Sequence, residues 1–318
     1  MSIKLGVVMD PIDNINFKKD SSLAMLLAAQ NRGFELFYME MNDLHVRDGV
    51  ARAHWKPLEV YNSPQRWFEL GAAEDRPLGD LDVLLMRKDP PFDMEFVYCT
   101  YLLERAEAAG VLVVNKPQSI RDANEKFFTA WFAQCCPPTL VTRSKADLHA
   151  FLSEHGDIIV KPLDGMGGSS IFRVAVDGPN TNVVFETLTA HESNLAMAQK
   201  YIPEIVDGDK RLLVIDGEPL NHVLARVPGP GDMRGNLAAG ATGVGREASE
   251  RDLWIASQIG PTLRDKGLLF VGLDIIGDYL TEINVTSPTC IRELDGFFDL
   301  DIGGRLMDTI ECYLSAGG

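Results

Sequence analysis

A glycine-rich segment in the middle of the sequence has the composition of a phosphate-binding loop. It contains Asp164, Gly165, Met166, Gly167, Gly168, Ser169 and Ser170, between predicted strands at 158–161 and 171–174. Glycines lack a Cβ atom, so backbone N–H groups in such a loop can approach phosphate oxygens closely. The Walker pattern Gly-x-x-x-x-Gly-Lys-Ser/Thr does not occur in the sequence. The alternative interpretation is a plain hairpin turn.

Two lysines strengthen the phosphate interpretation. Lys161 ends the strand that leads into the loop, and Lys126 lies near the start of a helix predicted over 124–132. A chain of phosphates needs positive charge from more than one direction, and two ammonium groups beside a glycine loop would supply it. Each lysine taken alone would be interpreted as a solvated surface residue.

A predicted hairpin over 268–284 carries a second set of chemical groups. Its turn contains Gly277 and Asp278, and strand pairing would bring Asp274, Glu282 and Asn284 close together. Oxygen ligands on adjacent strands suit a hard cation such as Mg²⁺, with Mn²⁺ as an alternative, shared with nucleotide phosphates. The other interpretation is an exposed polar face. The apolar neighbours Ile275 and Ile276 favour a buried ladder, in which unpaired acidic groups would be costly.

Basic side chains form a third set. They are Lys210, Arg211, Arg226, Arg234 and Arg292, in a chain with 30 Lys and Arg against 46 Asp and Glu. Such arginines could bind a substrate carboxylate or the transferred phosphoryl group, or they could form surface ion pairs. Asp209 precedes them and could accept a hydrogen bond from a ribose hydroxyl, although the Asp-Gly-Asp sequence there also suits a simple turn.

The segment 227–247 is rich in glycine and poor in apolar residues. It holds Gly229, Gly231, Gly235, Gly240, Gly243 and Gly245. A flexible linker is one interpretation. A lid is the other, because an activated carboxyl group must be shielded from water if an amine is to react with it.

The elements that position these groups follow an α/β pattern. Strands are predicted over 5–9, 34–39, 82–86 and 111–114, with helices over 21–32 and 93–110 between them. This alternation indicates a parallel sheet covered by helices. Ligands gather where such strands end, so residues 9–11, which include Asp10, and residues 87–93, which begin at Arg87, are predicted substrate walls.

The pattern of predicted elements changes after residue 115, where Lys116 and Pro117 suggest a turn. A domain boundary is predicted near residue 123. Beyond it we expect a small α+β unit with strands 139–142, 158–161, 171–174 and 196–201 and helices 145–154 and 181–190. Strands 211–215 and 220–226, a helix 249–266, the hairpin and one final helix complete the prediction.

Composition excludes several classes of function. The net charge of −16 repels nucleic acid and anionic membranes. No signal peptide and no membrane-spanning segment is predicted, so a cytoplasmic location is expected. The five cysteines (Cys99, Cys135, Cys136, Cys290 and Cys312) are then expected to be free thiols that act mostly in packing, and no zinc-binding spacing is present.

These pieces, in this order, resemble the ATP-grasp superfamily, and within it the prokaryotic glutathione synthetase family. The matching stretches are Val8–Pro11, Lys19–Ser22, Met86–Asp93, Asn115–Pro117, Asn124–Lys126, Lys161–Gly168, Gly208–Arg211, Arg234–Asn236, Val271–Asp274 and Asn284–Thr289.

The resemblance implies a fold of three subdomains and a reaction. The expected parts are an N-terminal substrate domain (1–123), a central lid subdomain (124–204) and a C-terminal catalytic subdomain (205–318). The implied reaction joins γ-glutamylcysteine to glycine, with ATP cleaved to ADP and phosphate. Homo-oligomers, commonly tetramers, are implied by likeness alone.

The resemblance also implies roles for individual residues. Lys126 and Lys161 would hold phosphates, Gly165–Ser169 would form a loop over them, and Gln199, Lys200, Tyr201 and Ile202 would meet adenine. Asp209 would contact ribose, and Asp274, Glu282 and Asn284 would bind magnesium. Arg211, Arg226 and Arg292 would steady phosphate and carboxylates, with Asn284, Ser287, Pro288 and Thr289 near the acyl group. The lid would span about 227–242 and include Gly229, Gly231, Arg234, Gly235, Asn236 and Gly240.

One departure concerns this lid. Where the family pattern has Gly-Gly-Arg, the chain has Gly240, Ala241 and Thr242, so the resemblance gives no support for an arginine contact there. Lys200 is also unusual for a residue near adenine, although backbone groups can bind adenine without the side chain.

Two alternative functions are consistent with the sequence. One is another ATP-grasp ligase, which joins D-alanine residues or adds glutamate, and the other is a nucleotide-binding regulator without catalysis.

Overall fold

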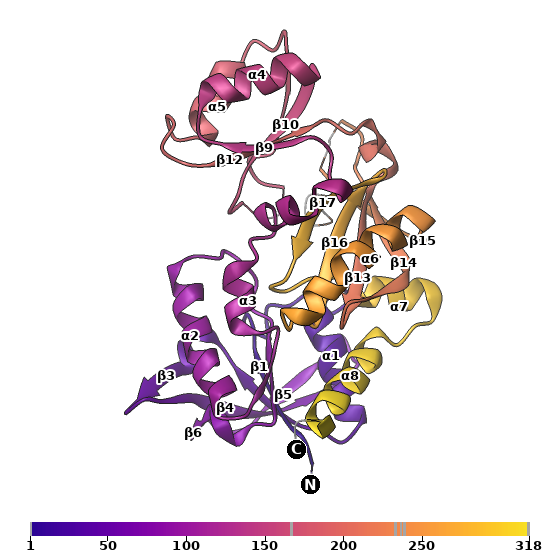
Figure 1. Cartoon of the computed structure of the whole chain (residues 1–318). Helices are drawn as coiled ribbons and strands as arrows, with labels where there is room; N and C mark the ends of the chain where they lie inside the picture. The colour runs from indigo at the N-terminus through magenta and orange to yellow at the C-terminus, as the bar shows by residue number, and fades with distance from the viewer. Residues whose placement is uncertain (1, 166–167, 232–233, 236, 238–239, 317–318) are drawn as a thin grey trace.

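The computed structural model describes residues 2–165, 168–231, 234–235, 237 and 240–316. Figure 1 shows a lower part built from β1 to β8, a middle part built from β13 to β17, and an upper part that contains β9 to β12. The lower sheet has the strand order β3-β4-β2-β1-β7-β8, with β5 and β6 also paired to β4. The pairs among β2, β1, β7 and β8 are parallel, and β4 runs antiparallel to β2.

The elements of this lower part have the following bounds. The strands are β1 Lys4–Val8, β2 Glu35–Met39, β3 Leu44–Arg47, β4 Val50–Val60, β5 Phe68–Leu70, β6 Glu74–Pro77, β7 Val83–Met86 and β8 Leu112–Val114. The helices are α1 Ser21–Asn31, α2 Met94–Ala108 and α3 Pro117–Asp122, with short 3-10 turns η1 Met41–Asp43 and η2 Leu78–Asp80.

Side-chain caps fix where the first two helices begin. The carboxylate of Asp20 accepts from the backbone N–H of Leu23 at the start of α1, and Asp93 does the same for Phe96 at the start of α2. The strands that precede these helices end at Val8 and Met86. The loops that could face a ligand therefore leave the sheet at the same edge, as predicted for a parallel sheet.

The upper part is an antiparallel sheet of order β11-β10-β12-β9, with two helices packed on it. Its elements are β9 Thr139–Thr142, α4 Lys145–His155, β10 Asp157–Pro162, β11 Phe172–Ala175, α5 Thr181–Leu188 and β12 Ala196–Lys200. The unit has its own core, in which Leu148, Ile158 and Phe185 are fully buried. The glycine loop joins β10 to β11, so its base is held by a stable hairpin.

The middle part is an antiparallel sheet of order β15-β14-β13-β16-β17. Its strands are β13 Asp209–Ile215, β14 Glu218–Val227, β15 Thr242–Glu247, β16 Phe270–Ile276 and β17 Tyr279–Asn284. The helical elements are η3 Phe127–Cys135, η4 Pro203–Asp207, α6 Glu250–Asp265, α7 Ile291–Phe298 and α8 Ile302–Ala316. Residues of η3 and α6 pack on the sheet in one core.

The lower and middle parts share a second core. Helix α8 packs along α1, and the two lie side by side in Figure 1. Leu26 of α1, Leu213 of β13 and Leu306 of α8 belong to this single apolar cluster. The amide of Asn115 adds polar contacts, donating to the carbonyl oxygens of Phe270 and Val285 at 2.8 and 2.7 Å. Asn115, which directly follows β8, therefore links the lower sheet to the hairpin β16–β17 through hydrogen bonds.

Several predicted elements are wrong in detail. Lys116 and Pro117 begin the helix α3 rather than a turn, since proline is well suited to the first helical position. The helix expected over 124–132 is a 3-10 segment that starts at Phe127 and contains a kink at Phe132. Residues 242–247 form the edge strand β15 instead of continuing the loop. Two C-terminal helices are present, because Asp299 adopts a left-handed conformation that ends α7.

No helix in the described ranges is long and apolar enough to cross a membrane. Cys99, Cys135 and Cys290 are buried thiols, as expected for packing residues, whereas Cys312 is exposed on α8.

Candidate active site

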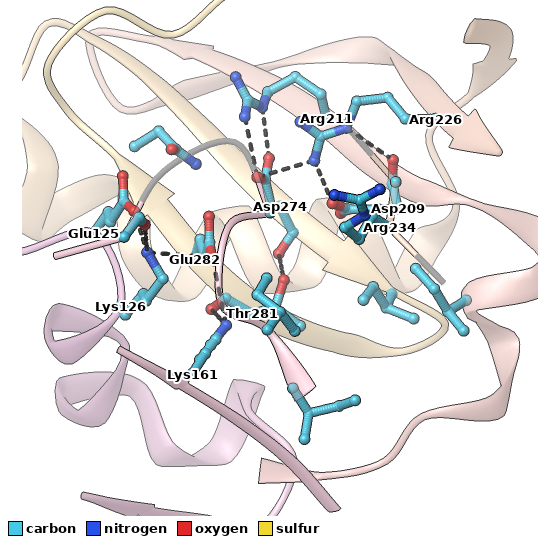
Figure 2. Close-up of a pocket in the computed structure, with 18 of the residues that line it drawn as sticks. Glu125, Lys126, Lys161, Asp209, Arg211, Arg226, Arg234, Asp274, Thr281 and Glu282 are labelled. Atoms are coloured by element: carbon cyan, nitrogen blue, oxygen red, sulfur yellow. Dashed lines mark hydrogen bonds and ion pairs between the residues drawn. The ribbon is translucent and has the colours of Figure 1, made fainter. Parts of the chain in front are cut away.

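A cavity of about 510 Å³ lies where all three parts of the fold meet. Most residues predicted for the site line it: Lys126, Lys161, Gly165, Gly168, Gln199, Lys200, Tyr201, Ile202, Asp209, Arg211, Arg226, Gly231, Arg234, Gly235, Asp274, Glu282, Asn284, Ser287, Pro288 and Thr289. Figure 2 shows the lysines on one side of the hairpin carboxylates and the arginines on the other.

Lys126 and Lys161 flank the carboxylate of Glu282. Their Nζ atoms lie 3.8 and 3.4 Å from Oε1 of Glu282, and both lysines are almost fully buried. Lys126 also donates to the carbonyl oxygen of Gly165 at 2.5 Å and pairs with the carboxylate of Glu125. Burial by itself would lower the pKa of Lys126, but the negative charges of Glu282 and Glu125 raise it. The ammonium group of Lys126 therefore stays charged beside the base of the glycine loop.

Asp274 forms ion pairs with two arginines at the centre of the middle sheet. The Arg211 Nη2 atom donates to Oδ2 of Asp274 at 3.0 Å, and an Arg226 nitrogen lies 2.9 Å from the same oxygen. Burial alone would raise the pKa of Asp274, but the charges of Arg211 and Arg226 outweigh it and hold the pKa below its ordinary value. This carboxylate is therefore ionised at neutral pH.

Asp209 lies beside the same arginines with one oxygen still available. Its Oδ2 atom accepts from Arg226, whereas its buried Oδ1 atom has no hydrogen-bond partner in the described structure. Burial raises the pKa of Asp209 to about 7, and the neighbouring Arg226 charge only partly offsets this. A buried acceptor without a partner is costly, so the geometry suits a ligand hydroxyl at this point.

The donor groups of the hairpin fit a magnesium ion. Strand pairing places Asp274 opposite Glu282, and Asn284 opposite Gly272, so all three reach the cavity from neighbouring positions. Two carboxylates and an amide are hard oxygen donors, and Mg²⁺ usually takes few protein ligands together with phosphates and water. In the described residues, no group of three or more His, Cys, Asp or Glu is arranged to hold a metal by itself.

Apolar side chains line the end of the cavity between the upper and middle sheets. Sequence reasoning missed them: Ile159, Ile171, Ile205, Leu237 and Ile276. Together with Tyr201 they form an apolar wall, which suits a nucleobase. The guanidinium of Arg173 stacks on the Tyr201 ring at 3.8 Å and so fixes its orientation. Apolar residues carry no local sequence signal for such a role, because the same residue types form every core.

The opposite end of the cavity is formed by residues of the lower part and by residues that follow β17 of the middle part. The Ser287 hydroxyl donates to Oδ1 of Asp89, and Arg87 donates to the carbonyl oxygen of Pro288 at 2.9 Å. Within the predicted wall 87–93, it is Asp89 and Pro90 that line the cavity. Arg87 instead lies beneath it, buried, and burial lowers the pKa of its guanidinium to about 10.

Some predicted site residues are not brought to the cavity. Asp10, Arg87, Ser169, Gly229, Gly240 and Arg292 are absent from its described lining, and Met166, Gly167 and Asn236 lie outside the described residues. Arg292 donates to the carbonyl of Phe17 and to Oδ1 of Asn62, each at 2.7 Å. Asp10 forms an ion pair with Lys88 at 2.9 Å.

Other lining residues did not stand out in the sequence. Glu125, Thr281 and Thr286 belong to this group, and Cys290, interpreted as a packing residue, both joins the shared core and lines the cavity. Burial raises the pKa of the Cys290 thiol, which fits packing better than nucleophilic chemistry. The sequence feature that could have identified Glu125 as a cavity residue is its position next to Lys126.

Solved structures share this fold along nearly its whole length. The ATP-grasp ligase PsnB, complexed with minimal precursor, Mg and ADP, has a TM-score of 0.63 and 18% identity and covers 98% of each chain. The D-cycloserine synthetase DcsG has a TM-score of 0.66 and 15% identity, covering 99% of this chain and all of that one. At such low identity these likenesses establish the fold alone. The fold is the ATP-grasp fold. The model of an ATP-grasp domain that matches residues 125–299 makes the chain an ATP-dependent ligase that forms carbon–nitrogen bonds.

Sequence comparison narrows this class. The models of the prokaryotic glutathione synthetase N-terminal domain and ATP-grasp domain match residues 3–121 and 125–299. A protein of Pseudomonas aeruginosa named glutathione synthetase is 66% identical over 316 residues, covering 99% of this chain and 100% of that protein. One of Escherichia coli (strain K12) with the same name is 64% identical over 312 residues, covering 98% and 99%. The chain belongs to the prokaryotic glutathione synthetase family. The predicted fold class and family are thus confirmed.

Proposed function

We propose that this chain joins γ-glutamylcysteine to glycine and converts ATP to ADP and phosphate. The observation that carries the proposal is the single cavity that combines an apolar wall, paired lysines, hairpin carboxylates and a separate polar end. Relatives that carry the name glutathione synthetase are similar along their full length, which favours this reaction over other ATP-grasp chemistry.

The nucleotide would lie between the upper and middle sheets. Adenine would lie against the apolar wall beside Tyr201, and a ribose hydroxyl would donate to the unpartnered Oδ1 of Asp209. The phosphates would reach the ammonium groups of Lys126 and Lys161 under the loop that begins at Gly165. These positions follow from the cavity lining and from the charge of each residue.

Magnesium would be held by Asp274, Glu282 and Asn284. When bound with the nucleotide, it would neutralise phosphate charge and draw electron density away from the terminal phosphorus. Asp274 is suited to this role because its two arginine neighbours keep it ionised. Arg211 and Arg226 would keep that carboxylate in place and add positive charge where the phosphoryl group moves.

Amide formation from a carboxylate and an amine is unfavourable in water, so the carboxylate must be activated first. A carboxylate oxygen of the cysteinyl residue would attack the terminal phosphorus of ATP, and the bond to ADP would break. The amine of glycine would then attack the resulting acyl phosphate, and phosphate would leave as the amide forms. The chain would act through positioning and electrostatics, without a nucleophilic side chain.

The segment 227–242 would shield the acyl phosphate from water. Gly231, Arg234, Gly235 and Leu237 of this segment line the cavity, which supports a covering role. Removing residues 229–240 should leave ATP binding largely intact while ADP release exceeds peptide formation. Unchanged coupling between the two would count against the lid.

The deciding experiment measures phosphate release from ATP with both γ-glutamylcysteine and glycine present. Release should require both substrates, and it should be absent with either alone or with two D-alanine molecules. Release with D-alanine would support the other ligase class, and ATP binding without any release would support a regulator. We further propose that the protein works in the cytoplasm as a homo-oligomer, with a tetramer expected by analytical ultracentrifugation.

A further inference from the structure

One carboxylate in the described cavity lining differs from the others in its partners. The acidic residues there are Asp89, Glu125, Asp209, Asp274 and Glu282. Four of them form ion pairs with Lys126, Lys161, Arg211 or Arg226. In the part of the chain that the structure describes, no Lys or Arg nitrogen comes within 4.0 Å of the Asp89 carboxylate.

The surroundings of Asp89 hold it in place without neutralising it. Its backbone N–H donates to Oδ2 of Asp10 at 2.9 Å, and Lys88 donates to its carbonyl oxygen at 2.7 Å. Lys88 pairs with the carboxylate of Asp10, so its charge is engaged elsewhere. The side chain of Asp89 accepts one neutral hydrogen bond, from the Ser287 hydroxyl.

Arg87 also leaves the charge of Asp89 uncompensated. Its guanidinium donates to the Ser22 hydroxyl and to the Pro288 carbonyl rather than to a carboxylate. Arg87 interacts at longer range with the charges of both Asp89 and Asp20, so one cation serves two anions. The cavity thus presents a fixed, accessible negative charge where Asp89 meets Ser287.

We propose that the Asp89 carboxylate binds the α-ammonium group of the γ-glutamyl residue of the dipeptide substrate. The inference rests on the proposed function and assigns the orientation of that substrate. An accessible carboxylate without a cationic partner is complementary to an ammonium group. Ser287 keeps the carboxylate directed along the wall that also contains Pro288 and Thr289.

The chemistry favours this ammonium over the amine of glycine. Glycine must attack as a neutral amine, and a carboxylate beside it would stabilise its unreactive protonated form. The α-ammonium of the glutamyl residue takes no part in bond formation and stays protonated throughout. A carboxylate that holds it would therefore fix the dipeptide without opposing the reaction.

The test compares two dipeptides in the wild-type protein and in Asp89→Asn. Glutarylcysteine has the same chain as γ-glutamylcysteine but lacks the α-amino group. The wild-type protein should prefer γ-glutamylcysteine by about tenfold or more in kcat/KM. Asp89→Asn keeps an acceptor for Ser287 and should lose most of this preference, with KM for ATP unchanged. Asp13→Asn, at an exposed aspartate of the same part of the fold, is the matched control.

Loss of the preference in Asp89→Asn would support the assignment of Asp89 to the α-ammonium group. A preference that survives in Asp89→Asn, or an equal loss with both dipeptides, would overturn the proposal and leave a structural role. A raised KM for glycine alone would place the acceptor amine at Asp89 and would also overturn it. Calorimetric titration of both dipeptides into the protein saturated with a non-hydrolysable ATP analogue gives the same comparison without phosphoryl transfer, so failure of the proposed reaction remains distinguishable from failure of this assignment.

Discussion

The Nζ atom of Lys161 lies 3.4 Å from Oε1 of Glu282, which links the upper sheet to the hairpin β16–β17 across the cavity. The lysine that we propose to bind phosphate and the carboxylate that we propose to bind the accompanying cation are thus adjacent. The attraction between these opposite charges holds the end of β10 against the hairpin β16–β17.

Replacing Glu282 by Gln should lower kcat by about 100-fold or more, because the neutral amide is a poor magnesium ligand. Turnover measured over a range of Mg²⁺ concentrations should show partial recovery at high Mg²⁺. Glu247→Gln, on the exposed edge strand β15, should behave like the wild-type protein. Near-normal turnover in Glu282→Gln would rule out the metal role.

Replacing Lys161 by Met should raise KM for ATP at least about tenfold, since a buried positive charge that we propose to bind phosphate is lost. Lys200→Met is the matched change on the same sheet. Lys200 is exposed and lines the cavity, and its backbone N–H donates to the Pro138 carbonyl at 3.0 Å. It should alter KM for ATP by no more than about twofold. Equal effects of the two changes would show that the Lys200 side chain also binds nucleotide.

Gly235 lies so close to Asp209 that a side chain would not fit. A Cβ atom there would be 2.5 Å from the Asp209 Cβ and 3.1 Å from the Arg226 carbonyl oxygen. Gly235→Ala should displace Asp209 and weaken ATP binding, measured by calorimetry, by about tenfold. At Gly229 the nearest atom would be 3.9 Å away, so Gly229→Ala should leave the affinity unchanged. Equal affinities for both variants would argue against contact between Asp209 and the nucleotide.

Arg292 is predicted from the sequence to be catalytic, and its structural surroundings suggest a different test. Its guanidinium lies 4.8 Å from the Phe17 ring centroid and donates to two oxygen atoms. Arg292→Ala should lower the free energy of unfolding by about 1–2 kcal/mol with little change in kcat. Arg246→Ala, on exposed β15, is the control for stability. A collapse of kcat at normal stability would instead support the catalytic role.

Asp295 makes the free energy of unfolding depend on pH. Burial raises its pKa from 3.8 to about 6, with a further contribution from Asp301. The folded state therefore binds the proton more tightly than the unfolded state, and stability falls as the pH rises from about 4 to 6. Asp295→Asn should remove this loss and gain about 1 kcal/mol at pH 7.5, after allowance for partial exposure, but only about a third of that at pH 4.5. Urea unfolding at both pH values tests this, and an equal gain at each would contradict it.

The sequence predicts elements well where local chemistry decides the outcome. The caps at Asp20 and Asp93 fix helix starts, and the Gly277 turn sets the pairing that places Asp274 opposite Glu282. The glycine-rich strand β15 was missed because its pairing with β14, rather than its own composition, makes it extended.

Tertiary contacts decide what the sequence could not show. The direction of Arg292 depends on where α7 packs against the Phe17 loop, and no spacing within the chain encodes that distance. The apolar wall proposed to bind the nucleobase combines Ile159 of β10 with Ile276 of β16, which only the folded chain brings together. The same holds for Asp89 and Ser287, which are separated by 198 positions.

The core shared by α1, β13 and α8 also sets an order of events during synthesis. Leu26 of α1 is buried in a cluster that includes Leu306 and Ile310, which are synthesised about 280 residues later. The apolar face of α1 would therefore stay uncovered until α8 emerges from the ribosome. The β9–β12 unit has a core of its own residues and could fold before that.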